Sequence, residues 1–162
     1  MKTLLIMRHA KAKAQAVGQA ERERQLAQRG RRNALEMGEL LRREGLEPQR
    51  ILSSTAVRAV QTACAMAEAL GCDDEVTLVD GLYNGGVEDY LDALAGLPDT
   101  VESALIVGHN PNLVELLADL TDQTEDLPTG AIAHVQLSLD RWADILTSPE
   151  GDLMAVWRPR EL

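Results

Sequence analysis

Aromatic side chains are scarce in this chain of 162 residues. They make up 2% of the sequence, and phenylalanine is absent. A hydrophobic core must therefore be built from Leu, Val, Ala, Ile and Met, and the overall hydrophobic content of 45% is typical of a globular protein. Because this length suits one domain with a substantial core, we expect residues 1–162 to form a single domain.

Cysteine is also scarce, which limits the covalent and metal chemistry that the sequence can support. Cys64 and Cys72 are eight positions apart and form no CxxC pair. Such a pair indicates neither a metal site nor a disulfide framework. We interpret Cys64 as a small buried residue of a helix.

Basic charge and long apolar runs are missing as well. The chain has 16 Lys and Arg against 26 Asp and Glu, a net charge of -10, which argues against binding to nucleic acids or anionic membranes. The apolar run at 3–7 is interrupted by Arg8 and His9 before it reaches the length of a signal peptide, and no run approaches a membrane span. We expect a cytoplasmic protein, in which a small basic site remains compatible with the acidic total.

Short apolar runs alternate with segments of helical periodicity along the chain. Residues 10–28 are expected to form a loop or partly helical lid, and residues 80–86 a loop. Ser53–Thr55 and Asn110 are interpreted as helix N-caps, with Pro111 in the first helical position. The alternation predicts an α/β fold with a mostly parallel sheet covered on both faces, and its last two strands antiparallel at one edge. The expected strands are 3–7, 51–52, 76–79, 104–107, 131–139 and 153–157, and the expected helices are 30–45, 57–70, 88–96 and 111–120.

Three of these strands run into residues that carry chemistry. Arg8-His9 follows the first strand, Arg58 lies one turn into the helix after the second, and Gly108-His109 follows the strand at 104–107. In parallel sheets the carboxyl ends of strands meet at one edge, where ligands bind. We therefore expect two arginines, two histidines and two helix N-termini to converge there.

This combination suits a dianionic phosphoryl group. Arginine forks match phosphate oxygens, and helix N-termini offer free amide donors with partial positive charge. A neutral histidine in such a pocket can act as a nucleophile and form a phosphohistidine intermediate, with the arginines stabilising charge in the transition state. The sequence contains no DxD motif, Walker loop or metal-ligand cluster, so we expect neither a metal nor another cofactor.

The motifs at 7–10, 53–62 and 107–110, in this order and at this wide spacing, resemble the histidine phosphatase superfamily. The pattern at 8–11 followed by 24–30 resembles its short SixA-like branch. The resemblance covers nearly the whole chain, and it implies a phosphoglycerate mutase-like, three-layer αβα sandwich. It also implies that His9 is the nucleophile, with Arg8, Arg58 and His109 completing the phosphate pocket and Arg24 reaching the substrate.

Two positions depart from the superfamily pattern. Many members have Gly after the Arg-His pair, whereas this chain has Ala10, as SixA-like members frequently do. Larger members also carry an acidic proton donor, and the equivalent region at 80–84 contains no clearly assigned carboxylate. Asp80 is the nearest candidate for this donor and Glu88 the next, although each is also read as an ordinary solvated acid or a cap residue.

A weak or missing acid favours one class of substrate over another. An alkoxide leaving group needs a general acid, whereas imidazole, with a pKa near about 6.5, leaves phosphorus far more readily. The short chain also leaves no room for a large capping domain. We therefore predict a phosphohistidine phosphatase that acts on a phosphorylated protein, such as a histidine-phosphotransfer domain.

Two other functions remain open at this stage. One is a phosphomonoesterase for a small phosphate ester, and the other is a non-catalytic module that binds phosphate or a phosphoprotein. A mutase is disfavoured because no second anion site is evident in the sequence. Lys11 and Lys13 could steer phosphate or be solvated, Arg29 is interpreted as part of a solvated helix start, and His134 as structural.

Overall fold

The computed structural model describes residues 1–72 and 76–159. Six strands form one sheet in the order β3-β2-β4-β1-β5-β6. The first four strands along the chain pair in parallel, β5 is antiparallel to β1, and β6 is antiparallel to β5, as predicted. The strands are β1 (Lys2–Arg8), β2 (Arg50–Ser53), β3 (Val76–Leu78), β4 (Ser103–Gly108), β5 (Ile132–Leu137) and β6 (Gly151–Trp157).

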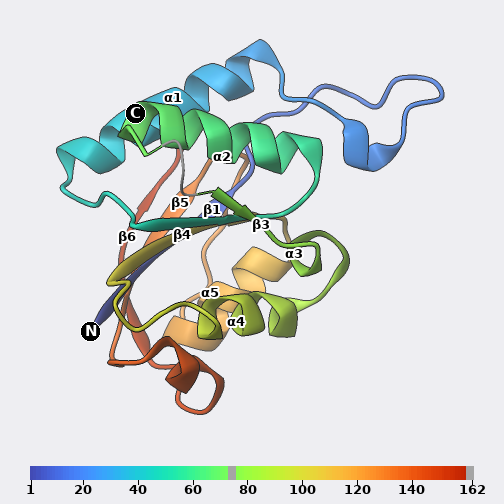
Figure 1. Cartoon of the computed structure of the whole chain (residues 1–162). Helices are drawn as coiled ribbons and strands as arrows, with labels where there is room; N and C mark the ends of the chain where they lie inside the picture. Colours follow the sequence, from blue (N-terminus) through green and yellow to red (C-terminus); the bar gives the residue numbers. More distant parts are fainter. Residues whose placement is uncertain (73–75, 160–162) are drawn as a thin grey trace.

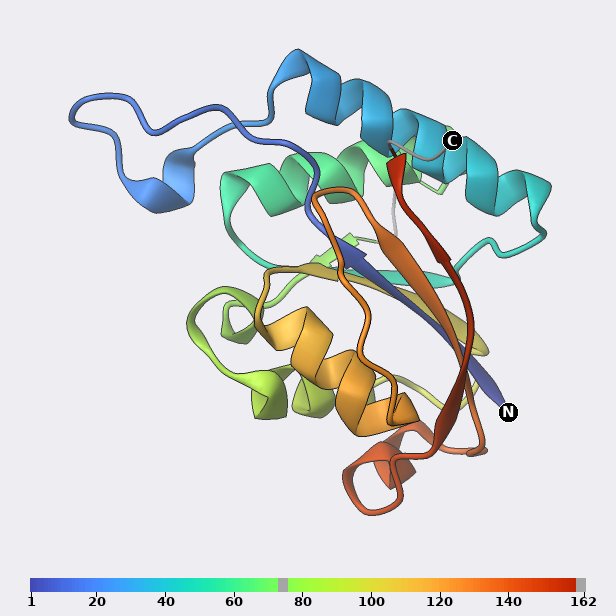
Figure 2. The same cartoon turned by 180° about the vertical axis from the view of Figure 1, so that it is seen from behind.

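Helices cover both faces of this sheet and produce the expected three layers (Figures 1 and 2). One face carries α1 (Gln28–Arg43) and α2 (Val57–Leu70), and the opposite face carries α4 (Val87–Ala95) and α5 (Asn112–Thr121) with the short α3 (Gly81–Asn84). Two 3-10 helices complete the fold, η1 (Glu21–Glu23) and η2 (Trp142–Leu146).

The apolar run of β1 explains why the sheet needs helices on both sides. Successive side chains of a strand point to opposite faces, so a fully apolar strand must be covered twice. Leu4 and Ile6 pack into the cluster beneath α4 and α5, while Leu5 and Met7 pack against α1 and α2. All four side chains are fully buried.

Three local predictions were wrong. The expected loop at 80–86 contains α3, because Leu82 is buried in the core and the Asp80 carbonyl accepts hydrogen bonds from Tyr83 and Asn84. Cys64 is exposed, because it lies beside the face of α2 that packs on the sheet rather than on it.

The third error concerns the helix caps. The N-cap of α2 is Ala56 and that of α5 is Pro111, and neither helix has a side-chain cap. Asn110 instead donates a hydrogen bond from Nδ2 to the Leu127 carbonyl.

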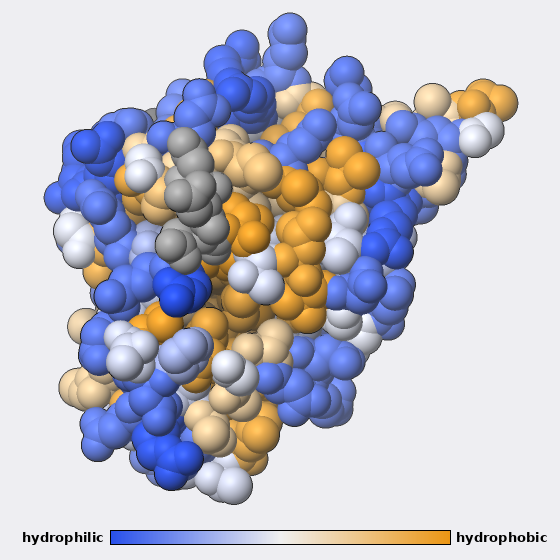
Figure 3. All heavy atoms as spheres, in the orientation of Figure 1, coloured by the Kyte–Doolittle hydropathy of each residue, from blue (hydrophilic) through white to orange (hydrophobic). Residues whose placement is uncertain are grey.

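One edge of the sheet and one long segment of the chain are exposed at the surface. Strand β3 forms one edge of the sheet, where Leu78 is 52% exposed, and hydrophobic residues gather between the two layers of helices on the face shown in Figure 3. Ala12 and Leu26 form an isolated bridge, and residues 13–25 between them, which we call the arm, project away from the body of the molecule (Figures 1 and 2). Within the described ranges, no helix has the length and apolar character needed to cross a membrane.

Candidate active site

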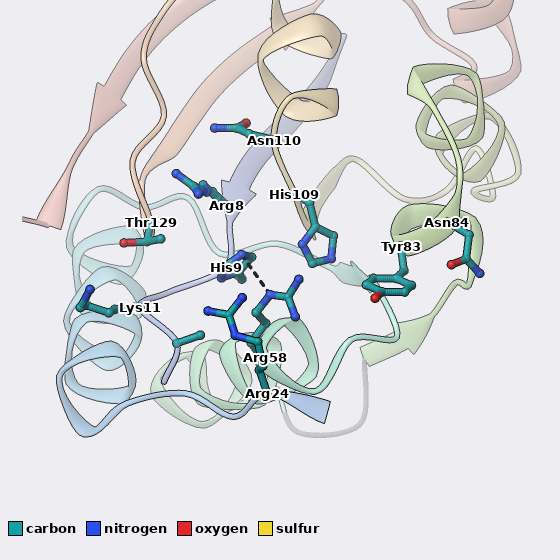
Figure 4. Close-up of a pocket in the computed structure, with 11 residues that line it drawn as sticks. Arg8, His9, Lys11, Arg24, Arg58, Tyr83, Asn84, His109, Asn110 and Thr129 are labelled. Atoms are coloured by element: carbon teal, nitrogen blue, oxygen red, sulfur yellow. Dashed lines mark hydrogen bonds between the residues drawn. The ribbon is translucent and has the colours of Figure 1, made fainter. Parts of the chain in front are cut away.

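The ends of three parallel strands lie side by side, as the sequence predicted. Met7 of β1 pairs with Val107 of β4, which in turn pairs with Ser53 of β2. The residues that follow them surround a pocket of about 650 Å³ (Figure 4). Its lining consists of Arg8, His9, Lys11, Ala12, Arg24, Arg58, Tyr83, Asn84, His109, Asn110 and Thr129.

His9 is held with one ring nitrogen directed toward Arg58. Its Nδ1 lies 2.8 Å from the carbonyl oxygen of Ala10. Because a carbonyl can only accept, Nδ1 carries the proton and Nε2 keeps its lone pair. Arg58 Nε donates to that Nε2 over 3.4 Å. Burial lowers the pKa of His9 to about 3, helped by the neighbouring His109, Arg58 and Arg8 and opposed by the bond to Ala10, so the ring is neutral at pH 7.

His109 lies across from His9, with 5.2 Å between the ring centroids (Figure 4). Its Nε2 is 2.8 Å from Ser54 Oγ, which also accepts a hydrogen bond from the Ala56 backbone. If the Ser54 hydroxyl proton goes to Nε2, the proton of the ring is on Nδ1, where it can be donated elsewhere. Burial lowers the pKa of His109 to about 4, and the charge of Arg58 acts in the same direction.

Two arginines supply positive charge to the pocket. Arg58, on the first turn of α2, is 6% exposed, and its NH2 pairs with the Glu21 carboxylate at 2.9 Å. Arg8, the last residue of β1, donates from NH1 to the Leu127 carbonyl, and burial lowers the pKa of its guanidinium. Both side chains line the pocket, and Figure 4 shows Arg58 against His9 and Arg8 on the side toward Asn110.

Buried hydroxyls fix the backbone that carries the two histidines. Thr62 of α2 accepts a hydrogen bond from the Ala10 amide and donates one to the Arg58 carbonyl. Tyr90 of α4 accepts from the His109 amide at 3.1 Å and donates to the Leu82 carbonyl. A Cβ at Gly108 would lie 2.3 Å from the Tyr90 hydroxyl, so glycine is needed there for Tyr90 to reach His109.

Arg24 also lines the pocket, and a carboxylate that the sequence analysis missed holds it there. Glu21 pairs with Arg24 at 3.2 Å and with Arg58, and it accepts a hydrogen bond from Tyr83 at 2.8 Å. Burial raises the pKa of Glu21, but the Tyr83 hydroxyl and the two arginines outweigh this and lower it, so the carboxylate is ionised at neutral pH. Arg58 NH1 also donates to the Glu21 backbone carbonyl at 3.2 Å, so Glu21 ties the arm to the pocket through its side chain and its backbone.

The structure does not bring the two candidate proton donors into the pocket. Asp80 accepts hydrogen bonds from Thr55 at 2.8 Å and from Arg22 at 2.6 Å, and these bonds lower its pKa. Glu88 is exposed on the first turn of α4. In the part of the chain that the structure describes, no carboxylate is among the residues that line the pocket.

Several lining residues were not expected as parts of the site. Tyr83 contacts the edge of the His109 ring, with 5.6 Å between the centroids. Asn84 and Tyr83 come from α3, which the sequence pattern did not indicate, and Thr129 comes from a loop that carries no motif. Asn110 directly follows the Gly-His pair, which was the available signal, and Lys11, for which the sequence left phosphate steering open, lines the pocket two residues after His9.

Two further placements bear on cofactors and on the remaining histidine. Within residues 1–72 and 76–159, no group of three or more His, Cys, Asp and Glu side chains is arranged to hold a metal ion. His134 is on β5, where its ring stacks on Trp157, and it is not among the lining residues.

Comparison with known proteins agrees with this geometry. The profile described as "Histidine phosphatase superfamily (branch 1)" matches residues 4–90. The chain belongs to the histidine phosphatase superfamily. An uncharacterized protein of Mycobacterium tuberculosis is 33% identical over 150 residues, which cover 86% of this chain and 91% of the relative.

Solved structures place the chain in the SixA-like branch of this superfamily. A candidate phosphohistidine phosphatase SixA from Nakamurella multipartitia has a TM-score of 0.86 and 29% identity, over 98% of this chain and 96% of that one. The protein histidine phosphatase SixA complexed with tungstate has a TM-score of 0.82 and 26% identity, over 98% of both chains. These matches confirm the predicted family and the phosphoglycerate mutase-like fold.

Proposed function

We propose that the protein is a phosphohistidine phosphatase that removes the phosphoryl group from a histidine of another protein. The observation that carries this proposal is the composition of the pocket. Neutral imidazole and cationic guanidinium groups surround it, and no described carboxylate lines it. Glu21, whose carboxylate pairs with Arg58 and Arg24, is ionised, so the pocket offers a nucleophile and charge stabilisation but no protonated carboxyl group for a poor leaving group.

In the first step, His9 Nε2 attacks the phosphorus of the substrate. A bond forms between Nε2 and phosphorus, while the bond from phosphorus to the substrate imidazole breaks. The substrate ring takes a proton from solvent on its other nitrogen and leaves as neutral imidazole, with the electron pair of the broken bond. The Ala10 carbonyl supports this step, because it fixes the Nδ1 proton and stabilises the ring as it becomes positively charged.

In the second step, water attacks the phosphorus bound to His9. The products are inorganic phosphate and free His9, so the overall reaction consumes one water molecule. Arg8 and Arg58 would hold the phosphoryl oxygens in both steps, and His109 Nδ1 would donate a further hydrogen bond. In this mechanism the two guanidinium groups supply the charge that a metal provides in other phosphatases, so a chelator is expected to leave turnover unchanged.

The surroundings of the pocket support a protein as the substrate. The arm extends away from the body beside the pocket, and its Val17 is fully exposed (Figure 1). A loop that covered the pocket would exclude a phosphorylated side chain still attached to its own backbone. The neighbour complexed with tungstate adds support, since tungstate is a tetrahedral oxyanion like phosphate.

A direct comparison of substrates tests the proposal. The full chain is assayed with a phosphohistidine protein and with a panel of small phosphomonoesters, each with and without EDTA. We expect kcat/KM to be highest for the phosphohistidine protein and to be insensitive to EDTA. A higher kcat/KM for a small ester would contradict the proposal and favour a small-molecule phosphomonoesterase, and absence of turnover on every substrate would favour a binding module.

A further inference from the structure

A second, smaller cavity adjoins the pocket on the side of α1. It has a volume of about 170 Å³ and is lined by Lys11, Arg29, Asn33, Pro128, Thr129 and Pro159. Lys11 and Thr129 line both cavities, so the two adjoin. Figure 4 shows Lys11 and Thr129 on one side of the pocket, beside α1, with Tyr83 and Asn84 on the opposite side.

The cations that line this cavity differ in their ion pairing from several other arginines of the protein. Arg22, Arg24 and Arg58 each form an ion pair with an acidic side chain. Within residues 1–72 and 76–159, no acidic side chain forms an ion pair with Lys11 or Arg29. In a chain of net charge -10, two unpaired cations in one cavity create a local preference for an anion.

The backbone around the cavity is fixed rather than loosely arranged. The Lys11 carbonyl accepts the Ala27 amide at the start of α1, and a Cβ at Gly30 would lie 2.1 Å from that carbonyl oxygen. On the other wall, the amide of Gly130, next to Thr129, donates to the carbonyls of Arg8 and His9. The cavity is thereby held at a constant position relative to the proposed nucleophile.

We propose that this cavity is a second anion subsite, which binds an acidic side chain close to the phosphohistidine of the substrate protein. The inference rests on the proposed function, which it deepens by naming a sequence preference of the substrate. Lys11 and Arg29 pair with the carboxylate, and the amide of Asn33 and the hydroxyl of Thr129 are available as further donors. No second anion site was evident from the sequence, in which Lys11 and Arg29 are 18 positions apart.

Binding of stable analogues tests this subsite separately from catalysis. Peptides carry a phosphonate analogue of phosphohistidine, with Glu placed in turn at each of the four positions before and after it, and a Gln version of each serves as reference. We expect at least one Glu peptide to bind wild-type protein about threefold to tenfold more tightly than its Gln version. Arg29→Gln is expected to abolish that difference and to leave the affinity for the Gln peptide unchanged.

A matched control and a second ligand class complete the experiment. Arg32→Gln removes the same charge from the same exposed helix, outside this cavity, and is expected to retain the preference. Loss of the preference in Arg32→Gln, or no Glu preference at any position, would overturn the proposal. The proposal would also be overturned if Arg29 affected only the preference for a small alkane bisphosphate over its monophosphate and had no effect on the preference for Glu peptides.

Failure of the subsite and failure of the proposed function give different results. If the Glu preference depends on Arg29 but phosphohistidine peptides are not hydrolysed, the subsite is supported and the catalytic proposal fails. If peptides carrying true phosphohistidine are hydrolysed at a rate that changes neither between the Glu and Gln versions nor in Arg29→Gln, the catalytic proposal is supported and the subsite fails.

Discussion

The two sides of the pocket are built in different ways. The inner wall, which consists of Arg8, His9, Arg58 and His109, is carried by strand ends and by the first turn of α2, with hydroxyls and carbonyls fixing its backbone. The arm meets the pocket through Arg24, which lines it, and through Glu21, whose carboxylate pairs with Arg58 and whose backbone carbonyl accepts a hydrogen bond from Arg58. The ion pairs of Arg24 with Glu21 and of Arg22 with Asp80 are partly or largely exposed, and exposed pairs contribute about 0–1 kcal/mol each, so we expect the arm to be displaced more easily than the inner wall.

This difference separates residues that set the chemistry from residues that set access. A displacement of about 1 Å in the inner wall would move the proposed nucleophile His9 away from the phosphorus, whereas the arm carries neither histidine. Substitutions in the inner wall should therefore reduce kcat sharply. Substitutions that release the arm should act on KM and remain small.

Arg58→Lys should give the largest loss among the binding groups. Lysine keeps the charge but loses the fork that reaches both His9 Nε2 and the substrate oxygens. We expect kcat/KM to fall about 100-fold, measured by steady-state kinetics on a phosphohistidine peptide. Arg43→Lys, at the far end of α1, is the control and should keep wild-type activity. A loss below about threefold for Arg58→Lys would mean that simple charge suffices there.

Tyr90→Phe tests whether the Tyr90 hydroxyl positions His109 of the inner wall. The change removes a buried hydroxyl that bonds the His109 amide and the Leu82 carbonyl, leaving both groups without that partner. We expect the free energy of unfolding to fall by about 1–3 kcal/mol in urea denaturation. We also expect kcat to fall while KM stays constant, since Tyr90 acts by positioning His109. Unchanged kcat in a folded variant would remove Tyr90 from the positioning network.

The pH dependence of stability reports on the two histidines of the inner wall. Their pKa values, about 3 for His9 and about 4 for His109, lie below the usual 6.5 because burial disfavours the charged ring. The unfolded chain therefore binds more protons than the folded chain below about pH 6.5, and stability must fall as the pH decreases from there toward 4. Each histidine contributes a slope of up to about 1.4 kcal/mol per pH unit.

Urea denaturation between pH 7 and pH 5 measures this slope. The double variant His9→Gln/His109→Gln should flatten it, leaving a smaller contribution from His134, whose pKa burial also lowers. Glu21 and Asp80, whose pKa values are lowered, lose their contributions only at more acidic pH. An unchanged slope in the double variant would show that the histidines are charged in the folded protein.

Substitutions of the two carboxylates Glu21 and Asp80 should have the smallest effects on turnover. Glu21→Gln removes a negative charge that competes with substrate for Arg58 and Arg24, so KM should fall by up to about threefold while kcat stays constant. Asp80→Asn, which weakens only the contacts to Thr55 and Arg22, should change kcat/KM by less than about twofold. A tenfold loss of kcat in either variant would identify that carboxylate as the missing proton donor.

The inner wall was predictable from the sequence and the family resemblance indicated Arg24 of the arm, whereas Glu21 and Tyr83 were not predicted. Parallel strands place their carboxyl ends at one edge, so Arg8-His9 and Gly108-His109 had to meet once their apolar runs were recognised. Glu21 reaches the pocket through a polar segment without periodicity, and Tyr83 through a helix of four residues that ends at Asn84. Neither position follows from local pattern, because ion pairs and packing between distant segments decide both.

The most direct test of the account is to trap the phosphoenzyme. Wild-type protein and His9→Ala are mixed with a substrate labelled on phosphorus and quenched within the first turnover at alkaline pH, which preserves phosphohistidine. We predict a burst of label bound to wild-type protein, located on His9 by peptide mapping, and none on His9→Ala, with His134→Ala labelled like the wild type. Turnover by wild-type protein without label on His9, or equal labelling of His9→Ala, would contradict the account.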